Sequence, residues 1–253
     1  MNVEIGMATC VFRSVEMVAV ARAAGMDFLI ADMEHGAMSL GEAAALCVAG
    51  RLAGYPVHVR VPRSSSDHLT RAADCGAGTI IVPHVDSLAE AQRIAQRLHF
   101  APRGERSLPS PVAMAGFRPV PFEELVQRCD DGFRVFSMIE AAAGLADCEA
   151  IAAVDGIDGL VIGAQDLAQS LGHPGDLRHP DVVAAFKRVA AAAATAGKVF
   201  GVMGVPADLL GSHALALGAG FVVATNEINL LFEAAEARAT ELRALAATFG
   251  ATR

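Results

Sequence analysis

Ionisable side chains stand at the ends of several apolar, strand-like stretches of this sequence. The stretch FLIADMEHG, residues 28–36, runs from strand-forming residues into Asp32, Glu34 and His35 within four positions. Comparable residues close or follow later stretches: Arg60, His84, Glu140 and Asp166. Acids, an arginine and a histidine together can hold a cation, stabilise an anion and move a proton. The pattern therefore indicates a catalytic site.

Glu140 and Asp166 follow stretches that we predict to be neighbouring strands. Two carboxylates at adjacent strand ends repel each other unless one is protonated or a cation bridges them. A divalent cation is the simplest solution, and hard oxygen ligands with an open shell suit Mg²⁺ or Mn²⁺. In the alternative interpretation, Glu140 is a structural carboxylate paired with Arg60.

Arg60 is the residue expected to work beside that cation. Side chains alternate along a strand, so His58 and Arg60 share one face of their strand, and Met138 and Glu140 share one face of theirs. Arg60 could then stabilise negative charge that develops on a substrate oxygen. His58, one layer lower, is expected to be a hydrogen-bonded core histidine.

His35 is the best candidate for a general base, because imidazole titrates near neutral pH. Asp32 or another carboxylate is expected to orient its ring. His84 is an alternative base, although helix capping or loop packing is the favoured interpretation of that residue.

Eight short stretches rich in β-branched residues recur along the chain, at 3–10, 28–33, 57–61, 79–84, 134–140, 158–163, 199–204 and 221–225. Segments with helical spacing lie between them, at 14–24, 39–53, 66–75, 87–98, 180–196, 206–217 and 227–247. Eight strand–helix units in 253 residues predict an α/β fold, a single (β/α)₈ TIM barrel over residues 1–253. The ionisable residues all fall at the carboxyl ends of the strands, where such barrels carry their sites.

Composition excludes several classes of protein. The formal charge of −8 disfavours nucleic acid and anionic membrane as partners, and no apolar run approaches the length of a membrane span. The N-terminus does not resemble a secretory signal, so we expect a cytoplasmic protein that acts on a small molecule. Five widely spaced cysteines do not indicate a disulfide framework.

The missing motifs narrow the chemistry further. The chain has only two lysines, Lys187 and Lys198, and both are predicted to lie away from the barrel mouth, which disfavours a Schiff-base mechanism. There is no Gly-x-Ser-x-Gly elbow, Walker A loop or dinucleotide fingerprint.

Two segments have open interpretations. Residues 100–121 hold five prolines and are either a functional loop, an interface element or an inert excursion. The last predicted helix carries an apolar stripe, which either mediates oligomerisation or packs on its own barrel: Ile228, Leu231, Ala235, Ala239, Leu242 and Leu245.

The motifs AAGMDFLIADMEHG, VRVP, DCGAGTIIVPHVDSLAEA, FSMIE and VDGIDGLVIGAQDLAQSLG, in this order, resemble the HpcH/HpaI family of metal-dependent class II pyruvate aldolases. That family includes 4-hydroxy-2-oxoheptanedioate aldolase and 2-dehydro-3-deoxyglucarate aldolase. The likeness runs from about residue 4 to residue 248. It implies a barrel that assembles as a hexamer with a swapped C-terminal helix, and reversible aldol cleavage that releases pyruvate.

The resemblance also implies roles for particular residues. Glu140 and Asp166 match the ligands of a Mg²⁺, Mn²⁺ or Co²⁺ ion, Arg60 matches the arginine that stabilises the pyruvate enolate, and His35 matches a base that works through water. Asp74 matches an acid that supports this histidine from a neighbouring subunit. The backbone of the segment 163–165 is implied to hold the pyruvate carboxylate, through Gly163, Ala164 and Gln165.

Three departures weaken the substrate assignment more than the reaction class. Met138 stands where the family commonly has a substrate-contacting glutamine, GAQD replaces the usual G-P-x-D, and GERS at 104–107 replaces G-x-R-G, although Arg106 keeps its place. We expect Gln165 to replace part of the lost contact. The main alternative is a related condensing enzyme on the same barrel, a siderophore-type citrate synthase or an acyl-CoA lyase. A non-catalytic, metabolite-binding barrel is a further alternative.

Overall fold

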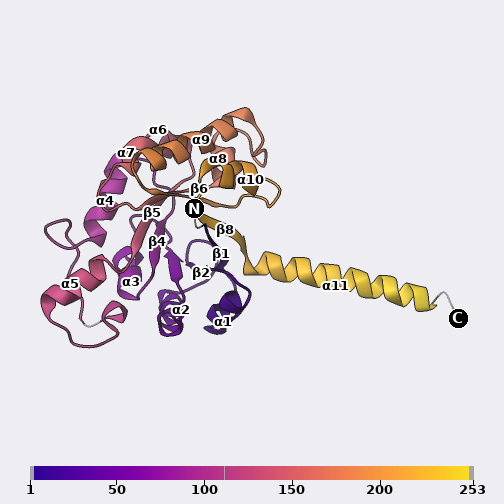
Figure 1. Cartoon of the computed structure of the whole chain (residues 1–253), viewed down its shortest axis with the longest axis horizontal. Coiled ribbons are helices and arrows are strands. Elements are labelled where there is room, and N and C mark those ends of the chain that lie inside the picture. Colours follow the sequence, from indigo (N-terminus) through magenta and orange to yellow (C-terminus); the bar gives the residue numbers. More distant parts are fainter. Residues whose placement is uncertain (1–2, 111, 251–253) are drawn as a thin grey trace.

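The computed structural model describes residues 3–110 and 112–250. Its eight parallel strands pair in chain order, and the last pairs with the first to close a barrel (Figure 1). The strands are β1 (Glu4–Thr9), β2 (Phe28–Asp32), β3 (Val57–Arg60), β4 (Thr79–Val82), β5 (Arg134–Ile139), β6 (Gly159–Gly163), β7 (Val199–Met203) and β8 (Phe221–Asn226). The predicted (β/α)₈ TIM barrel is confirmed, and each predicted strand is found within two residues of its expected ends.

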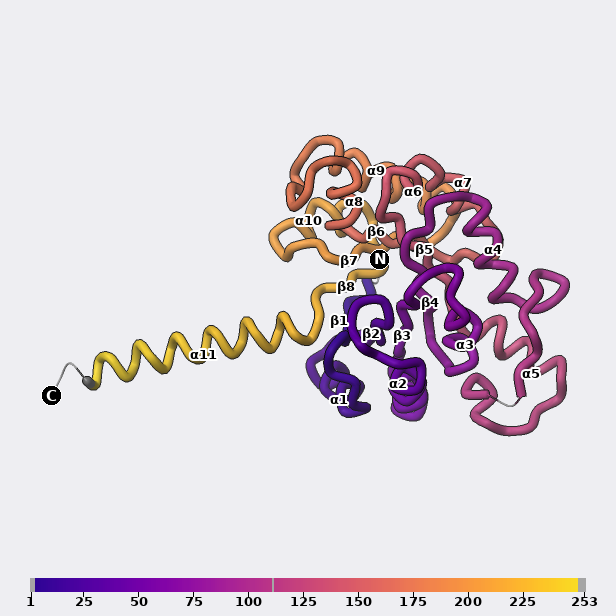
Figure 2. Tube along the Cα trace, turned by 180° about the vertical axis from the view of Figure 1, so that it is seen from behind, coloured from indigo at the N-terminus to yellow at the C-terminus, as the bar shows by residue number. Residues whose placement is uncertain are grey.

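Helices connect the strands and cover the outside of the barrel, except for the last helix, which projects from it (Figures 1 and 2). They are α1 (Glu16–Ala23), α2 (Leu40–Ala53), α3 (His68–Asp74), α4 (Leu88–Leu98), α5 (Phe122–Asp130), α6 (Ala142–Ala146), α7 (Cys148–Ala152), α8 (Ala164–Ser170), α9 (Pro180–Thr195), α10 (Leu210–His213) and α11 (Glu227–Gly250), with 3₁₀ turns η1 (Ala113–Ala115) and η2 (Leu215–Leu217). Local sequence explains several starts. Ser39 and Glu42 form a reciprocal capping box before α2, and Ser87 caps α4.

Two apolar layers hold the barrel together. The larger lies between strands and helices, and the smaller fills the barrel interior, where Phe28 stacks on Phe221 with 4.3 Å between ring centroids. His58 lies against both rings, and burial, with a smaller effect of the Arg134 charge, lowers its pKa to about 3. His58 is therefore a neutral core residue, as predicted. The expected hydrogen bond is wrong, because neither ring nitrogen has a partner among the described residues.

The observed helices depart from the expected ones in two places. The expected helix at 206–217 is only the short α10 followed by η2, with Gly218 in the left-handed region at its end. Helices that the sequence did not predict lie on either side of β5 and after β6, namely α5, α6, α7 and α8. The division of the chain into domains stays a prediction, and residues 1–2, 111 and 251–253 lie outside the described residues.

The proline-rich segment is anchored to the barrel through Arg106. This buried side chain donates to the Asp74 carboxylate at 2.6 Å and lies over the rings of Phe100 and Phe133. Leu108 and Phe117 of the same segment remain exposed. An inert excursion would not need a buried guanidinium, so the segment has a structural role at least.

Helix α11 leaves the barrel directly after β8 and projects away from it in both views (Figures 1 and 2). Its predicted apolar stripe is exposed, with Leu231, Leu242 and Leu245 between 51 and 53% accessible. The alternative in which this stripe packs on its own barrel is therefore wrong. In the described part of the chain, no helix combines the length and apolar character needed to cross a membrane.

Candidate active site

The pairing register of β2 and β3 sets Asp32 opposite Arg60 at the barrel mouth. The two side chains form a bidentate ion pair, with Nε to Oδ1 at 2.9 Å and Nη2 to Oδ2 at 2.5 Å, and both are buried. Burial alone would raise the pKa of Asp32, but the hydrogen bonds and charge of Arg60 outweigh it, so that this pKa lies below its usual range. Asp32 is therefore a fixed negative charge that orients Arg60.

Asp32 also organises the loop that follows β2. Its Oδ1 accepts the backbone N–H groups of Glu34 and His35 at 3.0 and 3.3 Å, and its Oδ2 accepts from the Cys10 thiol at 3.3 Å. The expectation that Asp32 orients the imidazole of His35 therefore needs correction, because its contact is with the His35 backbone. Burial and the Asp32 charge raise the pKa of Cys10 to about 12, so this thiol is a donor and not a nucleophile at neutral pH.

Glu34, His84 and Glu140 form a chain of contacts across the mouth. Glu34 lies 2.9 Å from Nη1 of Arg60 and 3.0 Å from Nε2 of His84. The other ring nitrogen of His84 lies 3.5 Å from Glu140, and its backbone N–H donates to the same carboxylate at 2.9 Å. His84 has a φ of 52°, a left-handed conformation that a non-glycine residue rarely adopts. This conformation directs the His84 backbone N–H to Glu140. The interpretation favoured from sequence, helix capping or loop packing, did not include this contact.

Glu140 is buried at the end of β5, and burial raises its pKa despite the opposing contacts from His84 and Arg60. It packs against Gly163 at the end of β6, where any added Cβ would collide with the carboxylate. Asp166 lies three residues further on, exposed in the first turn of α8. The structure therefore brings Glu140 to the strand end that precedes Asp166. It does not support the alternative in which Glu140 is mainly a partner of Arg60, since Asp32 and Glu34 take that role.

A cleft of about 700 Å³ opens beside Glu34 and His84. It is lined by Glu34, His35, Pro62, Arg63, Ser64, Ser65, Pro83, His84 and Glu90. His35 is exposed here, and Gly36 follows it with a φ of +128°, where a side chain would meet the Cys10 carbonyl at 2.5 Å. The EHG turn thus requires glycine to hold His35 at the cleft.

The remaining predicted residues lie in different places. Ala164 is buried beside Gly163, while the amide nitrogen of Gln165 donates to the Gly204 carbonyl at 3.1 Å. Met138 is fully buried in the interior layer of the barrel. Asp74 ends α3, ahead of β4 and so away from the mouth of its own chain, and pairs with Arg106.

Sequence reasoning missed Glu227, which is buried at the junction of β8 and α11. One of its oxygens accepts three consecutive backbone N–H groups, those of Cys10, Val11 and Phe12, at 2.8, 2.5 and 2.9 Å. This carboxylate fixes the loop after β1, whose Cys10 thiol reaches Asp32. The only signal in the sequence was an acid directly after the last strand.

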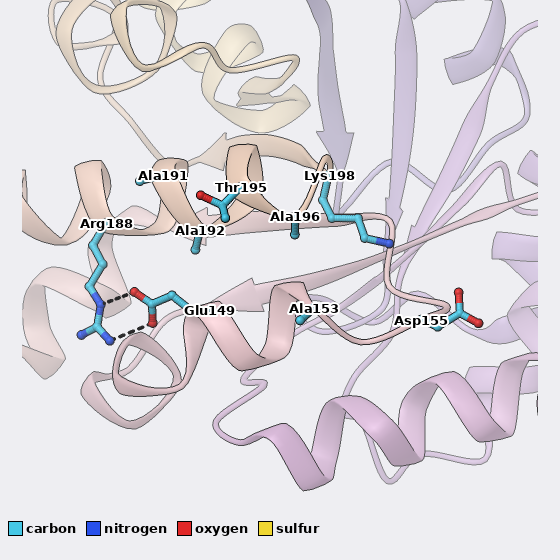
Figure 3. Close-up of a pocket in the computed structure, with 9 residues that line it drawn as sticks. All are labelled: Glu149, Ala153, Asp155, Arg188, Ala191, Ala192, Thr195, Ala196 and Lys198. Carbon is cyan, nitrogen blue, oxygen red and sulfur yellow. Dashed lines mark hydrogen bonds and ion pairs between the residues drawn. The ribbon is translucent and has the colours of Figure 1, made fainter.

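A second hollow of about 650 Å³ lies on the outside of the barrel between α7 and α9 (Figure 3). Its lining includes Asp155 and Lys198, which precede β6 and β7 and so belong to the end opposite the mouth. The hydrogen bond from Arg188 lowers the pKa of Glu149 in this hollow to about 2. Arg188 and Glu149 form an ion pair here, and the hollow has none of the convergent acids of the mouth.

The charges at the mouth fit a cation. Asp32 is compensated by Arg60, and Glu34 also pairs with that guanidinium. Among the described residues, neither the buried Glu140 nor the exposed Asp166 forms an ion pair with a lysine or arginine. Uncompensated carboxylates near buried surface are costly unless protonated or bound to a metal. Carboxylate oxygens are the donors that Mg²⁺ and Mn²⁺ prefer, so Glu140 and Asp166 suit such an ion.

The fold and the mouth together define a (β/α)₈ barrel with acid, guanidinium and imidazole groups at the carboxyl ends of its strands. Residues 12–231 match the family model described as HpcH/HpaI aldolase/citrate lyase, and the chain belongs to this family. The family resemblance expected from the motifs is thus confirmed.

Individual relatives agree with this assignment. The chain is 36% identical over 191 residues to a 4-hydroxy-4-methyl-2-oxoglutarate aldolase of Hapsidospora irregularis, covering 75% of this chain and 71% of the relative. It is 34% identical over 212 residues to a hydroxypyruvate/pyruvate aldolase of Pseudomonas aeruginosa, covering 82 and 77%.

Two solved structures are also similar to this chain over nearly its whole length. An HpcH/HpaI aldolase from Desulfitobacterium hafniense superposes with a TM-score of 0.89 at 27% identity, covering 96% of this chain and 93% of that one. The citrate synthase SbnG superposes with a TM-score of 0.86 at 25% identity, covering 97 and 95%.

Removing the charge of Asp32 is expected to destabilise the fold. In Asp32→Asn the buried Arg60 keeps only Glu34 as an acidic partner, and the free energy of unfolding should fall by about 3 kcal/mol at pH 7. The pKa of Asp32 in the folded state lies below its ordinary value of 3.8. The contribution of Asp32 to the free energy of unfolding is therefore fully present above pH 3.8, and it is lost as the pH falls through the lower pKa of the folded state. The difference between variant and wild type should therefore shrink below pH 3.8.

Urea unfolding at pH 7 and at a pH below 3.8 measures the difference in the free energy of unfolding between Asp32→Asn and wild type. The control is Glu149→Gln, which breaks an exposed Arg188 pair and should cost at most about 1 kcal/mol. Equal losses in the two variants at pH 7 would contradict the role of the buried pair.

Glu227→Ala should leave three backbone N–H groups without an acceptor. A loss of about 1–3 kcal/mol in the free energy of unfolding is expected, because buried donors retain their desolvation cost. Glu227→Gln keeps a carbonyl oxygen and should lose less. Thermal and urea unfolding measure both, with exposed Glu233→Ala on the same helix as control. A Glu227→Ala protein as stable as the control would disprove the anchoring role.

Proposed function

We propose that this protein is a divalent-metal-dependent aldolase, a carbon–carbon lyase that cleaves or forms 4-hydroxy-2-oxo acids through a pyruvate enolate. The observation that carries the proposal is the excess of carboxylates around one oriented guanidinium at the barrel mouth. The names of the relatives support the same reaction class. The small molecules are a 2-oxo acid, pyruvate, and an aldehyde.

Glu140 and Asp166 are the proposed ligands of the cation, which is Mg²⁺, Mn²⁺ or Co²⁺. When bound, it supplies Lewis acidity that draws electron density from the keto group of the 2-oxo acid. The burial of Glu140 and its close packing on Gly163 keep its carboxylate in one position. His84 steadies the same carboxylate through its backbone N–H.

Arg60 is the proposed stabiliser of the enolate. A guanidinium has five N–H donors, and contacts with Asp32 and Glu34 occupy three of them, so donors remain for a substrate oxygen. Because Asp32 fixes the plane of the guanidinium, these donors need not reorganise as negative charge develops. The backbone N–H groups at the start of α8, in the segment of Gly163, Ala164 and Gln165, are proposed to receive the pyruvate carboxylate.

His35 is the proposed base. It would take the proton from the 4-hydroxyl group, through a water molecule, as the bond between carbons 3 and 4 breaks and the aldehyde leaves. Asp32 holds the backbone of His35, and Asp74 of a neighbouring subunit is proposed to support the ring. Met138 lies in the buried interior, so the polar contact expected of a glutamine there is not replaced at that position.

A condensing reaction on the same barrel is the second candidate. The similarity to the citrate synthase SbnG favours it, whereas the curated relatives favour the aldolase. Consumption of oxaloacetate with acetyl-CoA, and not of pyruvate with an aldehyde, would select this second candidate. A barrel that only binds a metabolite is disfavoured by the oriented Arg60 and the acids around it.

We also propose assembly as a cytoplasmic hexamer in which α11 is exchanged between subunits. The exposed apolar stripe and the projection of α11 from the barrel support this proposal. Such a stripe is costly in water and is stabilised when another surface covers it.

Chelation of the metal should abolish turnover. After dialysis against a chelator we expect kcat for pyruvate–aldehyde chemistry to fall by on the order of 100-fold or more, because Lewis acidity supplies several kcal/mol. Added Mg²⁺, Mn²⁺ or Co²⁺ should restore it. Glu140→Gln should resemble the chelated enzyme and resist restoration, with exposed Glu123→Gln as a matched control. Full activity after exhaustive metal removal would refute the metal assignment.

Leu242→Glu should disrupt assembly, because it introduces a charge into the apolar stripe. At 3.6 residues per turn, Ala244 lies on the opposite side of α11, so Ala244→Glu adds the same charge away from the stripe. Light scattering coupled to gel filtration should give a hexamer for wild type and Ala244→Glu and a smaller species for Leu242→Glu. A monomeric wild type, or equal masses for both variants, would overturn the proposed assembly.

A further inference from the structure

The loop between β3 and α3 carries a guanidinium that has no partner in the described part of the chain. Arg63 lies on this loop, exposed, and its side chain lines the cleft beside Glu34 and His84. It is the only lysine or arginine among the residues that line this cleft. Among the described residues, its side chain forms no ion pair and no hydrogen bond. The role of this charge is therefore not explained by contacts within the fold.

The backbone around Arg63 is held in place by its neighbours. The proline ring of Pro62 fixes the φ of the preceding position. The Arg63 carbonyl accepts the backbone N–H of Ser66 at 3.2 Å. From α4, Arg97 donates to the carbonyls of Ser64 and Ser66, both at 3.2 Å. A side chain on a fixed backbone loses less conformational freedom on binding than one on a mobile loop, so Arg63 is presented to the cleft in advance.

The acids that line the cleft are already bonded to other groups. Glu34 pairs with the Arg60 guanidinium and the His84 imidazole. Both oxygens of Glu90 accept hydrogen bonds from neutral donors, one a serine hydroxyl and the other a backbone N–H. Neither acid forms an ion pair with Arg63. This guanidinium is therefore available to an anion that enters from solution.

The cleft lies on the acceptor side of the proposed reaction. His35, the proposed base at carbon 4, lines it. Neither proposed metal ligand lines it, and nor does the segment 163–165. These are the groups proposed to hold the 2-oxo acid, so the cleft is left for the molecule that the enolate attacks. A group bound by Arg63 therefore belongs to the acceptor.

The charge of the cleft favours a carboxylate over a phosphate as that group. A guanidinium binds the two oxygens of a carboxylate through two parallel hydrogen bonds, and the two charges cancel. A phosphate monoester carries about two negative charges near neutral pH. With Arg63 as the only lysine or arginine of the lining, its second charge would face Glu34 and Glu90 uncompensated.

We propose that Arg63 selects an acceptor that carries a carboxylate, so that the second substrate is an oxo acid and not a neutral aldehyde. In the condensation direction, carbon 3 of the enolate bonds to the acceptor carbonyl carbon, and the carbonyl oxygen takes a proton from His35 through water. The acceptor carboxylate stays unchanged on Arg63, which is a specificity-determining residue. This inference rests on the proposed aldolase function and adds the chemical class of the acceptor.

Paired acceptors test the inference. Glyoxylate with acetaldehyde, and 4-oxobutanoate with butanal, are chains of equal length with and without a carboxylate. With pyruvate and Mg²⁺, the wild-type kcat/KM should favour the anionic member of at least one pair. In Arg63→Gln this ratio should fall about 10-fold, mainly through the KM of the anionic acceptor, because a charge-assisted hydrogen bond is lost. A ratio measured within one protein does not depend on the folded fraction.

Two further variants and a change of salt serve as controls. Arg63→Lys should recover part of the ratio, because an ammonium keeps the charge but not the planar fork. Arg93→Gln removes an exposed guanidinium of α4 that does not line the cleft, and it should keep the wild-type ratio. High ionic strength should lower the wild-type preference, since Arg63 is exposed, and change the ratio of Arg63→Gln much less.

Exchange of the pyruvate methyl protons with deuterium, followed by NMR without an acceptor, reports enolate formation alone. No exchange in the wild type would refute the proposed function and this inference with it. Exchange combined with no preference in either pair, or with an unchanged ratio in Arg63→Gln, would overturn the inference and leave the proposed function standing. A higher kcat/KM for glycolaldehyde phosphate than for both oxo acids would also overturn it, in favour of a phosphorylated acceptor.

Discussion

The buried pair between Asp32 and Arg60 is the interaction on which the mouth depends. The parallel register of β2 and β3 sets the two residues opposite each other, and the bidentate geometry leaves the guanidinium one orientation. Because Asp32 also holds the backbone after β2, the same carboxylate positions Glu34 and His35. Strand pairing, a buried charge and the loop after β2 are therefore parts of one arrangement.

The acids around this pair are held close together at an energetic cost. Burial favours the protonated form of Glu140, and Glu34 adds repulsion, while contacts with His84 and Arg60 oppose both effects. Under the proposed function, a bound cation would compensate this carboxylate in place of a proton. The strained backbone of His84 belongs to the same arrangement, because its bent conformation aims an N–H at the Glu140 carboxylate.

Much of the fold and part of the site followed from sequence. Apolar stretches such as TIIV mark strands buried on both faces, and their carboxyl ends located Arg60 and Glu140 at the mouth. The contacts of His84 did not follow, because they depend on a rare φ that periodicity does not encode. The pair between Asp32 and Arg60 did not follow either, because it depends on the register of β2 and β3, which one sequence does not give.

Other departures have related physical causes. The short helices α6, α7 and α8 are too brief to give a helical repeat. His58 has no hydrogen-bond partner among the described residues because aromatic rings surround it, and a single sequence does not reveal that neighbourhood.

The carboxylate of Glu227 connects the junction of β8 and α11 to the loop after β1. Three backbone N–H groups of the loop after β1 donate to one oxygen of Glu227, at the start of α11. The Cys10 thiol in the same loop donates to Asp32, which orients Arg60. The first turn of α11 is thus linked to the Arg60 guanidinium by hydrogen bonds through Cys10 and Asp32. A partner surface that repositioned the start of α11 would therefore act on the mouth through the loop after β1.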